Sequence, residues 1–252
     1  MNRLFLLLFV VANASAEQGF MPISGSEYLS EQVRDMQEDE FANPAMPTVD
    51  YGRSLFHKVN DEGHRCSGCH GENGNKLKLE RIAAYPVYDR EQERPITLQN
   101  QINICREERM DDFPYVYDCR EMVGLETYMK FLARGQIIRV QTDGPMTPFY
   151  QAGKQLYHRR FGQMEMSCAH CHDQHRGAWL RGQVLNQGQS NGFPVYRLST
   201  SRVTSLHRRF SECLFSFRAE PFLSGSDEYI NLELFVNARG NGLSIETPAI
   251  RD

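Results

Sequence analysis

The sequence lacks several features that define large classes of proteins. Outside the N-terminus it has no apolar run near the roughly 20 residues that a membrane helix needs, so it is not a polytopic membrane protein. Basic residues are not in excess, with Lys+Arg 28 against Asp+Glu 32, which argues against nucleic-acid binding. The 7 cysteines are an odd number, which excludes a closed set of disulfides. The cysteines are therefore the feature to explain.

The first 16 residues have the pattern of a secretory signal. Arg3 supplies the basic start, residues 4–12 form an apolar core, and residues 14–16 (Ala-Ser-Ala) form a small-residue cleavage site. The alternative, a membrane anchor, needs a longer apolar run. We therefore expect cleavage after Ala16 and a mature protein in the periplasm.

Basic residues are concentrated in one segment of the chain. Residues 154–209 contain nine Lys or Arg and two acidic residues, a net charge of +7. The rest of the mature chain is then −12. This asymmetry suggests a small anionic ligand or an acidic partner surface, and a solvated arginine-rich face is the alternative.

The same series of landmarks occurs twice, about 100 residues apart. Each copy has a Gly-x-x-Leu-aromatic-His run, a Cys-x-x-Cys-His motif, a lone cysteine and a helical pattern that opens with Leu-Glu and closes with Ala-Arg-Gly. The landmarks begin at Gly52, Cys66, Cys105 and Leu125 in the first copy and at Gly153, Cys168, Cys213 and Leu232 in the second. Such parallel spacing predicts two homologous domains.

Cys-x-x-Cys-His is the attachment motif of c-type haem, in which two thiols bind the vinyl groups and the histidine is the proximal iron ligand. A thioredoxin-like pair or a four-cysteine zinc site is the alternative. However, zinc pairs rarely each carry a trailing histidine, and an oxidoreductase needs only one pair. The motifs predict two covalent haem c groups, with His70 and His172 as proximal ligands. The attaching thiols are those of Cys66, Cys69, Cys168 and Cys171.

The predicted fold is mainly α, because helical patterns dominate and strand signals are sparse. We expect two tandem cytochrome c-like domains related by internal duplication, each with one covalent haem. The predicted boundaries are a signal peptide at 1–16, a loosely ordered N-terminal extension at 17–50, a first domain at 51–145 and a second domain with the active site at 146–252.

The sixth iron ligand of a cytochrome c is usually a downstream methionine or histidine, but the chain has no methionine after Met166. For the second iron this leaves Cys213 and His207, since His175 lies too close to the attachment motif. Cys213 is favoured because Cys105 occupies the equivalent position in the first copy, where no residue is expected to match His207. We predict thiolate ligation by Cys105 and Cys213. The alternatives to Cys105 are Met110, Met122 and Met129.

Cys119 is the cysteine that remains unassigned. It is predicted to have no equivalent in the second copy and to be a leftover thiol. The alternative is a disulfide with Cys105, which an oxidising compartment would permit. A buried structural role is the alternative for either lone cysteine, Cys105 or Cys213.

Arg209 precedes Cys213 by four residues, so the two share a face if this segment is helical. The guanidinium would stabilise a thiolate and could hold a divalent oxyanion through two hydrogen bonds. Thiolate ligation lowers the reduction potential of a haem. A thiolate beside basic residues is also a sulfur nucleophile, which indicates sulfur chemistry.

These motifs, together with residues 103–106 (Asn-Ile-Cys-Arg) and the run from Arg218 to Gly242, resemble the SoxA family from about residue 50 to the C-terminus. The resemblance implies the dihaem cytochrome subunit of an L-cysteine S-thiosulfotransferase, paired with a small SoxX cytochrome. Thiosulfate would be joined oxidatively to a cysteine of the carrier SoxYZ, and two electrons would pass to haem and on to a downstream cytochrome. Cys213, carried as a persulfide, and Arg209 would be the catalytic residues.

Some members of this family carry a disulfide in place of the first haem, whereas this chain keeps the full first motif and resembles the dihaem type. Two other functions remain open at this point. One is a non-catalytic dihaem electron carrier, and the other is a thiosulfate dehydrogenase that forms tetrathionate.

Overall fold

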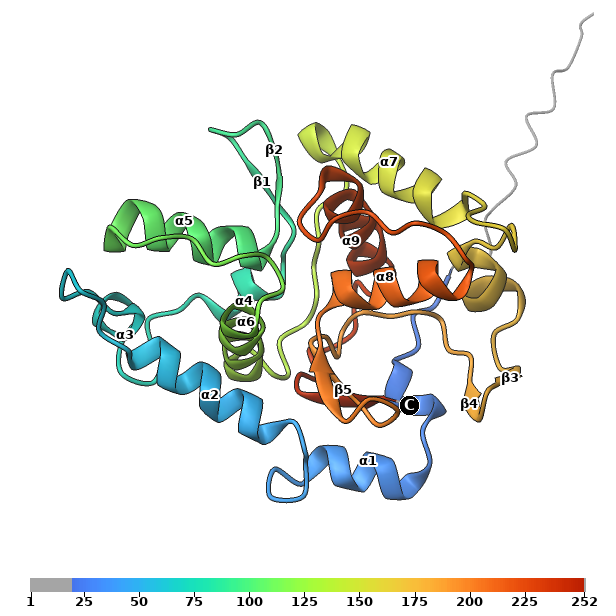
Figure 1. Ribbon diagram of the computed structural model, residues 1–252, viewed down its shortest axis with the longest axis horizontal. Coiled ribbons are helices and arrows are strands. Elements are labelled where there is room, and N and C mark those ends of the chain that lie inside the picture. Colours follow the sequence, from blue (N-terminus) through green and yellow to red (C-terminus); the bar gives the residue numbers. More distant parts are fainter. Residues whose placement is uncertain (1–19, 252) are drawn as a thin grey trace, which may run out of the picture.

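The computed structural model describes residues 20–251 and shows a mainly helical protein with short strands (Figure 1). The predicted signal peptide and its cleavage site lie outside the described residues. None of the helices in the described part of the chain is both long and apolar enough to cross a membrane.

The two halves contain similar series of elements. The first half consists of α2 (Met46–His57), α3 (Cys66–His70), α4 (Leu79–Ile82), β1 (Val87–Asp89), β2 (Arg94–Ile96), α5 (Leu98–Met110) and α6 (Arg120–Leu132). The second consists of η2 (Gly144–Met146), α7 (Thr147–His158), the π-helical turn η3 (His170–Gln174), β3 (Trp179–Leu180), β4 (Gln183–Val184), β5 (Val195–Arg197), β6 (Arg202–Thr204), α8 (Leu206–Ser216), α9 (Asp227–Arg239) and β7 (Ala249–Arg251).

Each half is built on one closely packed helix pair, α2 with α6 and α7 with α9. A glycine permits the close approach in each pair. A Cβ at Gly52 would collide with the carbonyl oxygen of Gly124, and a Cβ at Gly153 would collide with that of Asn231. The same contact at the same place in the two halves supports the predicted duplication.

In each half a two-stranded antiparallel hairpin leads directly into the helix that carries the lone cysteine. Hairpin β1–β2 precedes α5, and hairpin β5–β6 precedes α8. Thr97 and Ser205 are the N-caps of these helices, and each side chain accepts a hydrogen bond from the backbone N–H three residues later. Cys105 and Cys213 each lie eight residues after the cap. Local capping therefore fixes both cysteines at the same helical position.

The two halves share a hydrophobic core. Its largest cluster is formed mainly by the first half but includes Leu234 of α9 and Ile245. The C-terminal segment also crosses between the halves, because Gly135 N–H donates to the carbonyl of Ile245 before β7 pairs in parallel with β5. The two predicted domains therefore meet in one packed unit.

Residues 20–50 are ordered, contrary to the expectation of a loosely ordered extension at 17–50. It forms η1 (Gly25–Tyr28) and α1 (Glu31–Glu38), both of which contact β7. Gln37 accepts hydrogen bonds from the backbone of Ile250 and from the Arg251 guanidinium. Polar side chains in a buried setting thus hold this segment against the C-terminal strand, an interaction that local composition does not reveal.

Candidate haem sites

The second Cys-x-x-Cys-His motif lines a cavity in the second half of the molecule. Cys168, Cys171 and His172 lie on its wall, and Arg209 and Cys213 reach it from α8. The residues predicted for the second haem therefore converge on one cavity, although they come from separate elements.

His172 has the surroundings of a proximal iron ligand. Its Nδ1 lies 2.8 Å from the carbonyl oxygen of Asn186, an arrangement that fixes the ring and leaves Nε2 for a metal. Gly188 packs against the ring, where a Cβ would come within 2.8 Å of it. Burial lowers the pKa of His172, with smaller effects in the same direction from Arg209 and Arg239, so the ring is neutral as metal binding requires.

The thiols of the second motif are neutral at the wall of the cavity. Burial raises the pKa of Cys168 to about 12 and raises that of Cys171 as well. Among residues 20–251 no group of three or more His, Cys, Asp or Glu side chains is arranged to hold a metal ion. Both thiols and His172 face the same cavity, an arrangement that fits a c-type haem.

A second cavity in the first half has an equivalent construction. Cys66, His70 and Cys105 line it. Burial raises the pKa of Cys66 to about 11 and lowers the pKa of His70. Cys69 is exposed and does not contribute to the wall. These features fit a first haem.

The structure reduces the number of candidates for the sixth iron ligand in the first half but leaves more than one. Of the three methionine alternatives, Met110 and Met129 line the cavity together with Cys105, whereas Met122 is fully buried in the core. Cys105 also has a polar neighbour, because Gln101 Nε2 lies 3.5 Å from its sulfur.

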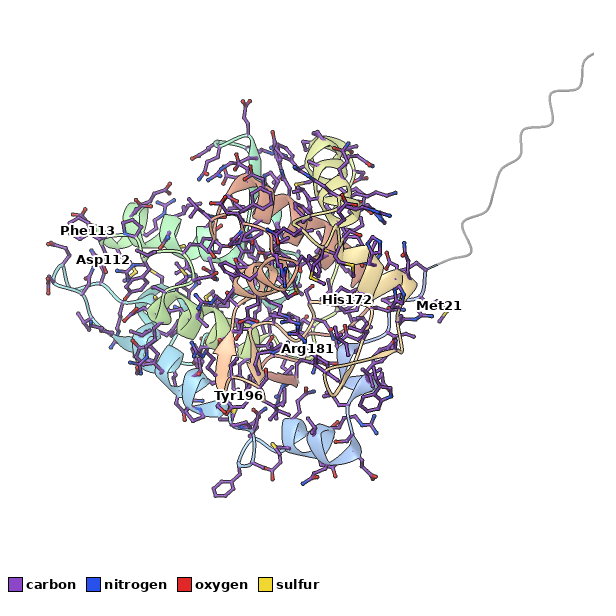
Figure 2. All side chains as sticks on the ribbon, turned by 45° about the vertical axis from the view of Figure 1, so that its right-hand side comes forward. Met21, Asp112, Phe113, His172, Arg181 and Tyr196 are labelled. Atoms are coloured by element: carbon purple, nitrogen blue, oxygen red, sulfur yellow. The ribbon has the colours of Figure 1, made fainter. Side chains whose placement is uncertain are left out.

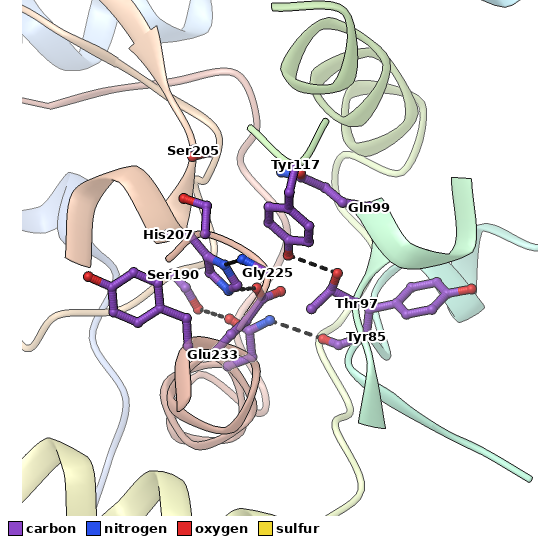
Figure 3. A network of polar contacts seen from close by, with 12 residues as sticks. Tyr85, Thr97, Gln99, Tyr117, Ser190, Ser205, His207, Gly225 and Glu233 are labelled. Carbon is purple, nitrogen blue, oxygen red and sulfur yellow. Dashed lines mark hydrogen bonds and ion pairs between the residues drawn. The ribbon is translucent and has the colours of Figure 1, made fainter. Parts of the chain in front are cut away.

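His207, the alternative ligand in the second half, is engaged elsewhere. It is fully buried, its Nε2 lies 2.9 Å from Glu233 Oε2, and its Nδ1 accepts a hydrogen bond from Gly225 N–H (Figure 3). Tyr117 stacks on the ring at 4.8 Å between centroids. The ring thus has partners at both nitrogens, and Cys213 is the one of the two candidates that lines the cavity.

The expectation that nothing in the first half matches His207 is wrong. Gln99 occupies the same position after its N-cap, and its side chain donates to Glu126 and accepts from the backbone N–H of Asp118. Both residues therefore bind a carboxylate from the helix that follows and a backbone N–H at its start.

Cys119 has a structural position that the sequence analysis missed. It is the N-cap of α6, where its sulfur accepts a hydrogen bond from Met122 N–H at 3.4 Å, and Ser226 caps α9 in the same way. Cys119 thus has a counterpart in the second half, contrary to prediction. Cys119 forms no disulfide with Cys105 in this structure.

Arg209 lies on the same face of α8 as Cys213, as predicted. The charge of Cys213 is the main cause of a raised pKa for Arg209, and Glu212 contributes as well. Arg209 Nη1 lies 3.2 Å from Glu212 Oε2. Glu212 was not identified from the sequence. Its spacing of three residues from Arg209 on an expected helix could have indicated the pair. Most other members of the basic segment lie on the surface, including Arg181 in the turn of hairpin β3–β4 (Figure 2), whereas Arg197 is buried and lines the cavity.

The comparisons of this chain with known proteins agree with one another. Residues 51–138 match the family described as SoxA/TsdA, cytochrome c domain. The L-cysteine S-thiosulfotransferase subunit SoxA of Pseudaminobacter salicylatoxidans is 38% identical over 247 residues, covering 96% of this chain and 86% of the relative. The subunit of the same name from Paracoccus pantotrophus is 36% identical, covering 90% of this chain and 78% of the relative.

A solved structure agrees with the sequence comparison. The crystal structure of SoxXA from P. pantotrophus contains a chain that superposes with a TM-score of 0.85 at 36% identity, covering 91% of this chain and 86% of that one. The mainly helical cytochrome c fold predicted from the sequence is thereby confirmed.

Proposed function

This chain belongs to the SoxA family of L-cysteine S-thiosulfotransferase subunits, and we propose that it couples thiosulfate oxidatively to a cysteine of a carrier protein. The net reaction joins the carrier thiol to the sulfane sulfur of thiosulfate. It forms one S–S bond, releases one proton and removes two electrons, so that a thiol and a dianion give an S-thiosulfonate monoanion. A non-catalytic electron carrier would use the same cofactors but make no such bond.

Two side chains of α8 carry the chemistry in this proposal. Arg209 holds the dianion through its guanidinium, and the outer sulfur of the Cys213 persulfide receives the sulfane sulfur as a transient thiosulfonate. The carrier thiolate then attacks that sulfane sulfur, and Cys213 leaves as its persulfide anion. Covalent haem c, attached through the two Cys-x-x-Cys-His motifs, supplies the electron acceptor when bound.

The observation that carries the proposal is a difference between the two cavities. In the second, an arginine lies four residues before the lone cysteine and is affected electrostatically by it. In the first, the same position holds the uncharged Gln101. A dianion therefore has Arg209 one helical turn from Cys213, whereas the corresponding place beside Cys105 is uncharged. The cation next to Cys105, Arg106, is bound to Asp112 at 2.8 Å, and the other cations that line the first cavity come from other segments. The placement of Arg209 thus favours catalysis in the second half.

The remaining parts of the proposal follow from the family and the sequence. A SoxX-like small cytochrome is the partner subunit, a SoxYZ-like protein is the carrier, and a further cytochrome takes the electrons. The protein carries two haems, one per half, with boundaries near residues 51–145 and 146–252. Cys105 and Cys213 are the thiolate ligands, Cys213 is carried as a persulfide, and the mature chain functions in the periplasm.

The test uses the purified heterodimer with thiosulfate, carrier protein and an electron acceptor. Cys213→Ala should abolish the mass increase of the carrier, because the sulfur that receives the substrate is lost. Cys119→Ser is the matched control and should retain turnover, since Cys119 lines neither haem cavity. Carrier modification by the Cys213→Ala complex would contradict the catalytic role, and tetrathionate as the sole wild-type product would favour the thiosulfate dehydrogenase alternative.

A further inference from the structure

Glu212 is the residue next to Cys213 that the proposed reaction does not use. Its carboxylate lies 3.2 Å from the guanidinium of Arg209, and the two side chains retain 31% and 28% of their exposure. Both side chains are therefore partly exposed. An ion pair in such a setting can open and close without a large desolvation cost.

The charged pair is confined to the second half. Helices α5 and α8 align residue by residue from their N-caps, Thr97 and Ser205, to their lone cysteines. At the position of Arg209 the first half has Gln101, and at the position of Glu212 it has Ile104. Neither member of the pair is therefore needed to hold a haem beside a cysteine. The pair distinguishes the second cavity from the first.

Charge balance suggests what Glu212 does. Arg209 lines the cavity and carries one positive charge, which it shares between Glu212 and the sulfur of Cys213. An incoming dianion must compete with the carboxylate for the same N–H donors. Resting on the function proposed above, we propose that Glu212 is a positioning residue that occupies the Arg209 guanidinium between turnovers and is displaced by the oxyanion end of thiosulfate.

This exchange weakens the binding of every oxyanion by the same factor, so it has two consequences. Sulfate presents the same charge and similar oxygens but has no sulfane sulfur, and a resident carboxylate keeps such anions from remaining on Arg209. The product is a monoanion that binds Arg209 more weakly than the dianionic substrate, so the same weakening promotes its release. Discrimination between thiosulfate and sulfate then depends on the sulfane sulfur, which reacts at Cys213.

The test compares the wild-type heterodimer with Glu212→Gln, Glu212→Asp and Glu165→Gln. Glu165 is the matched control because it pairs at 3.7 Å, in an exposed setting, with Arg160 of the same basic segment, and Arg160, unlike Arg209, does not line the cavity. Sulfate is the probe for equilibrium binding to the resting complex, measured by calorimetry without carrier protein. The KM for thiosulfate and kcat are measured separately, and the haem absorption spectrum reports whether ligation is intact.

We expect Glu212→Gln to lower both the sulfate Kd and the thiosulfate KM by a common factor of about three to ten, the equivalent of one partly exposed ion pair, with no rise in kcat. Glu212→Asp and Glu165→Gln should remain near wild type. An unchanged or higher sulfate Kd in Glu212→Gln with a normal spectrum would overturn the proposal, as would an equal change in Glu165→Gln. Because sulfate binding needs no turnover, this result is separable from a failure of the wild-type complex to modify the carrier.

Discussion

Cys119 and Ser226 occupy one position in the two halves, and each caps a helix with its side chain. The two capping distances are equal at 3.4 Å, but sulfur is a weaker acceptor than a hydroxyl oxygen. Cys119→Ser should therefore leave the free energy of unfolding unchanged or raise it slightly. Cys119→Ala removes the acceptor and should cost about 1 kcal/mol.

The measurement for this prediction is denaturant unfolding followed by circular dichroism. Haem-to-protein stoichiometry provides the control, since neither variant should lose cofactor. Loss of haem from Cys119→Ser would show that the thiol has a role other than capping.

At the scale of single residues, the sequence identified the functional residues that belong to a local motif. The two Cys-x-x-Cys-His motifs, the lone cysteines and the spacing of Arg209 from Cys213 all led to residues that line the cavities, apart from the exposed Cys69. It missed the partners that only tertiary contacts define. Glu233 meets His207 from another helix, and Asn186 fixes His172 from a loop 14 residues away.

Helix pairs set the positions of both motifs, and each pair depends on a glycine. At Gly153 of α7 an added methyl group would overlap the backbone of Asn231 and come within 3.0 Å of Phe235 Cβ. Because α7 and α9 cannot separate without disturbing the cavity that Leu156 and Tyr157 line, we expect Gly153→Ala to cost about 1–3 kcal/mol of unfolding free energy.

Thermal unfolding of the heterodimer, monitored by helix signal and haem absorbance, tests this expectation. Gln151→Ala is the control, because Gln151 is exposed on the same helix. A Gly153→Ala variant as stable as the control would mean that the helix pair tolerates a wider spacing.

Long elements were easier to predict from the sequence than short ones. The helices that carry the lone cysteines, and the helices that follow them, have 11 to 13 residues and show a helical pattern in the sequence. The strands have only two or three residues, too few for an alternating pattern to be distinguished. A repeat signal did exist in Pro86-Val87-Tyr88 and Pro194-Val195-Tyr196, which lead into the two equivalent hairpins and would have aligned Gln99 with His207.

At the scale of the whole molecule, polar contacts join the two halves. Asn237 of α9 donates to the carbonyl of Tyr85, and Ser224 donates to Asp118. The sequence predicted two domains but not this interface, because its residues come from positions more than 100 apart. The halves should therefore unfold together rather than as separate units.

Lys130 is the cation at the centre of this interface. Its Nζ lies 2.9 Å from Glu126 of its own helix. Burial alone would lower its pKa, but the carboxylates of Glu126 and of Glu233, across the interface, raise it above the usual value. A lysine whose folded-state pKa is raised contributes stability that is complete at neutral pH and is lost as the pH rises through that value. The protonated amine thus stabilises carboxylates from both halves.

Lys130→Met should destabilise both halves at once, because it leaves two buried carboxylates without their shared cation. We expect a loss of about 3–5 kcal/mol at neutral pH, with the helix signal and the haem absorbance changing in a single transition. Arg94→Gln is the matched control, since Arg94 pairs with Asp227 across the same interface but in an exposed setting, and it should cost less than about 1 kcal/mol. Equal stability of the two variants, or more than one unfolding transition in the wild type, would mean that the buried charges do not couple the halves.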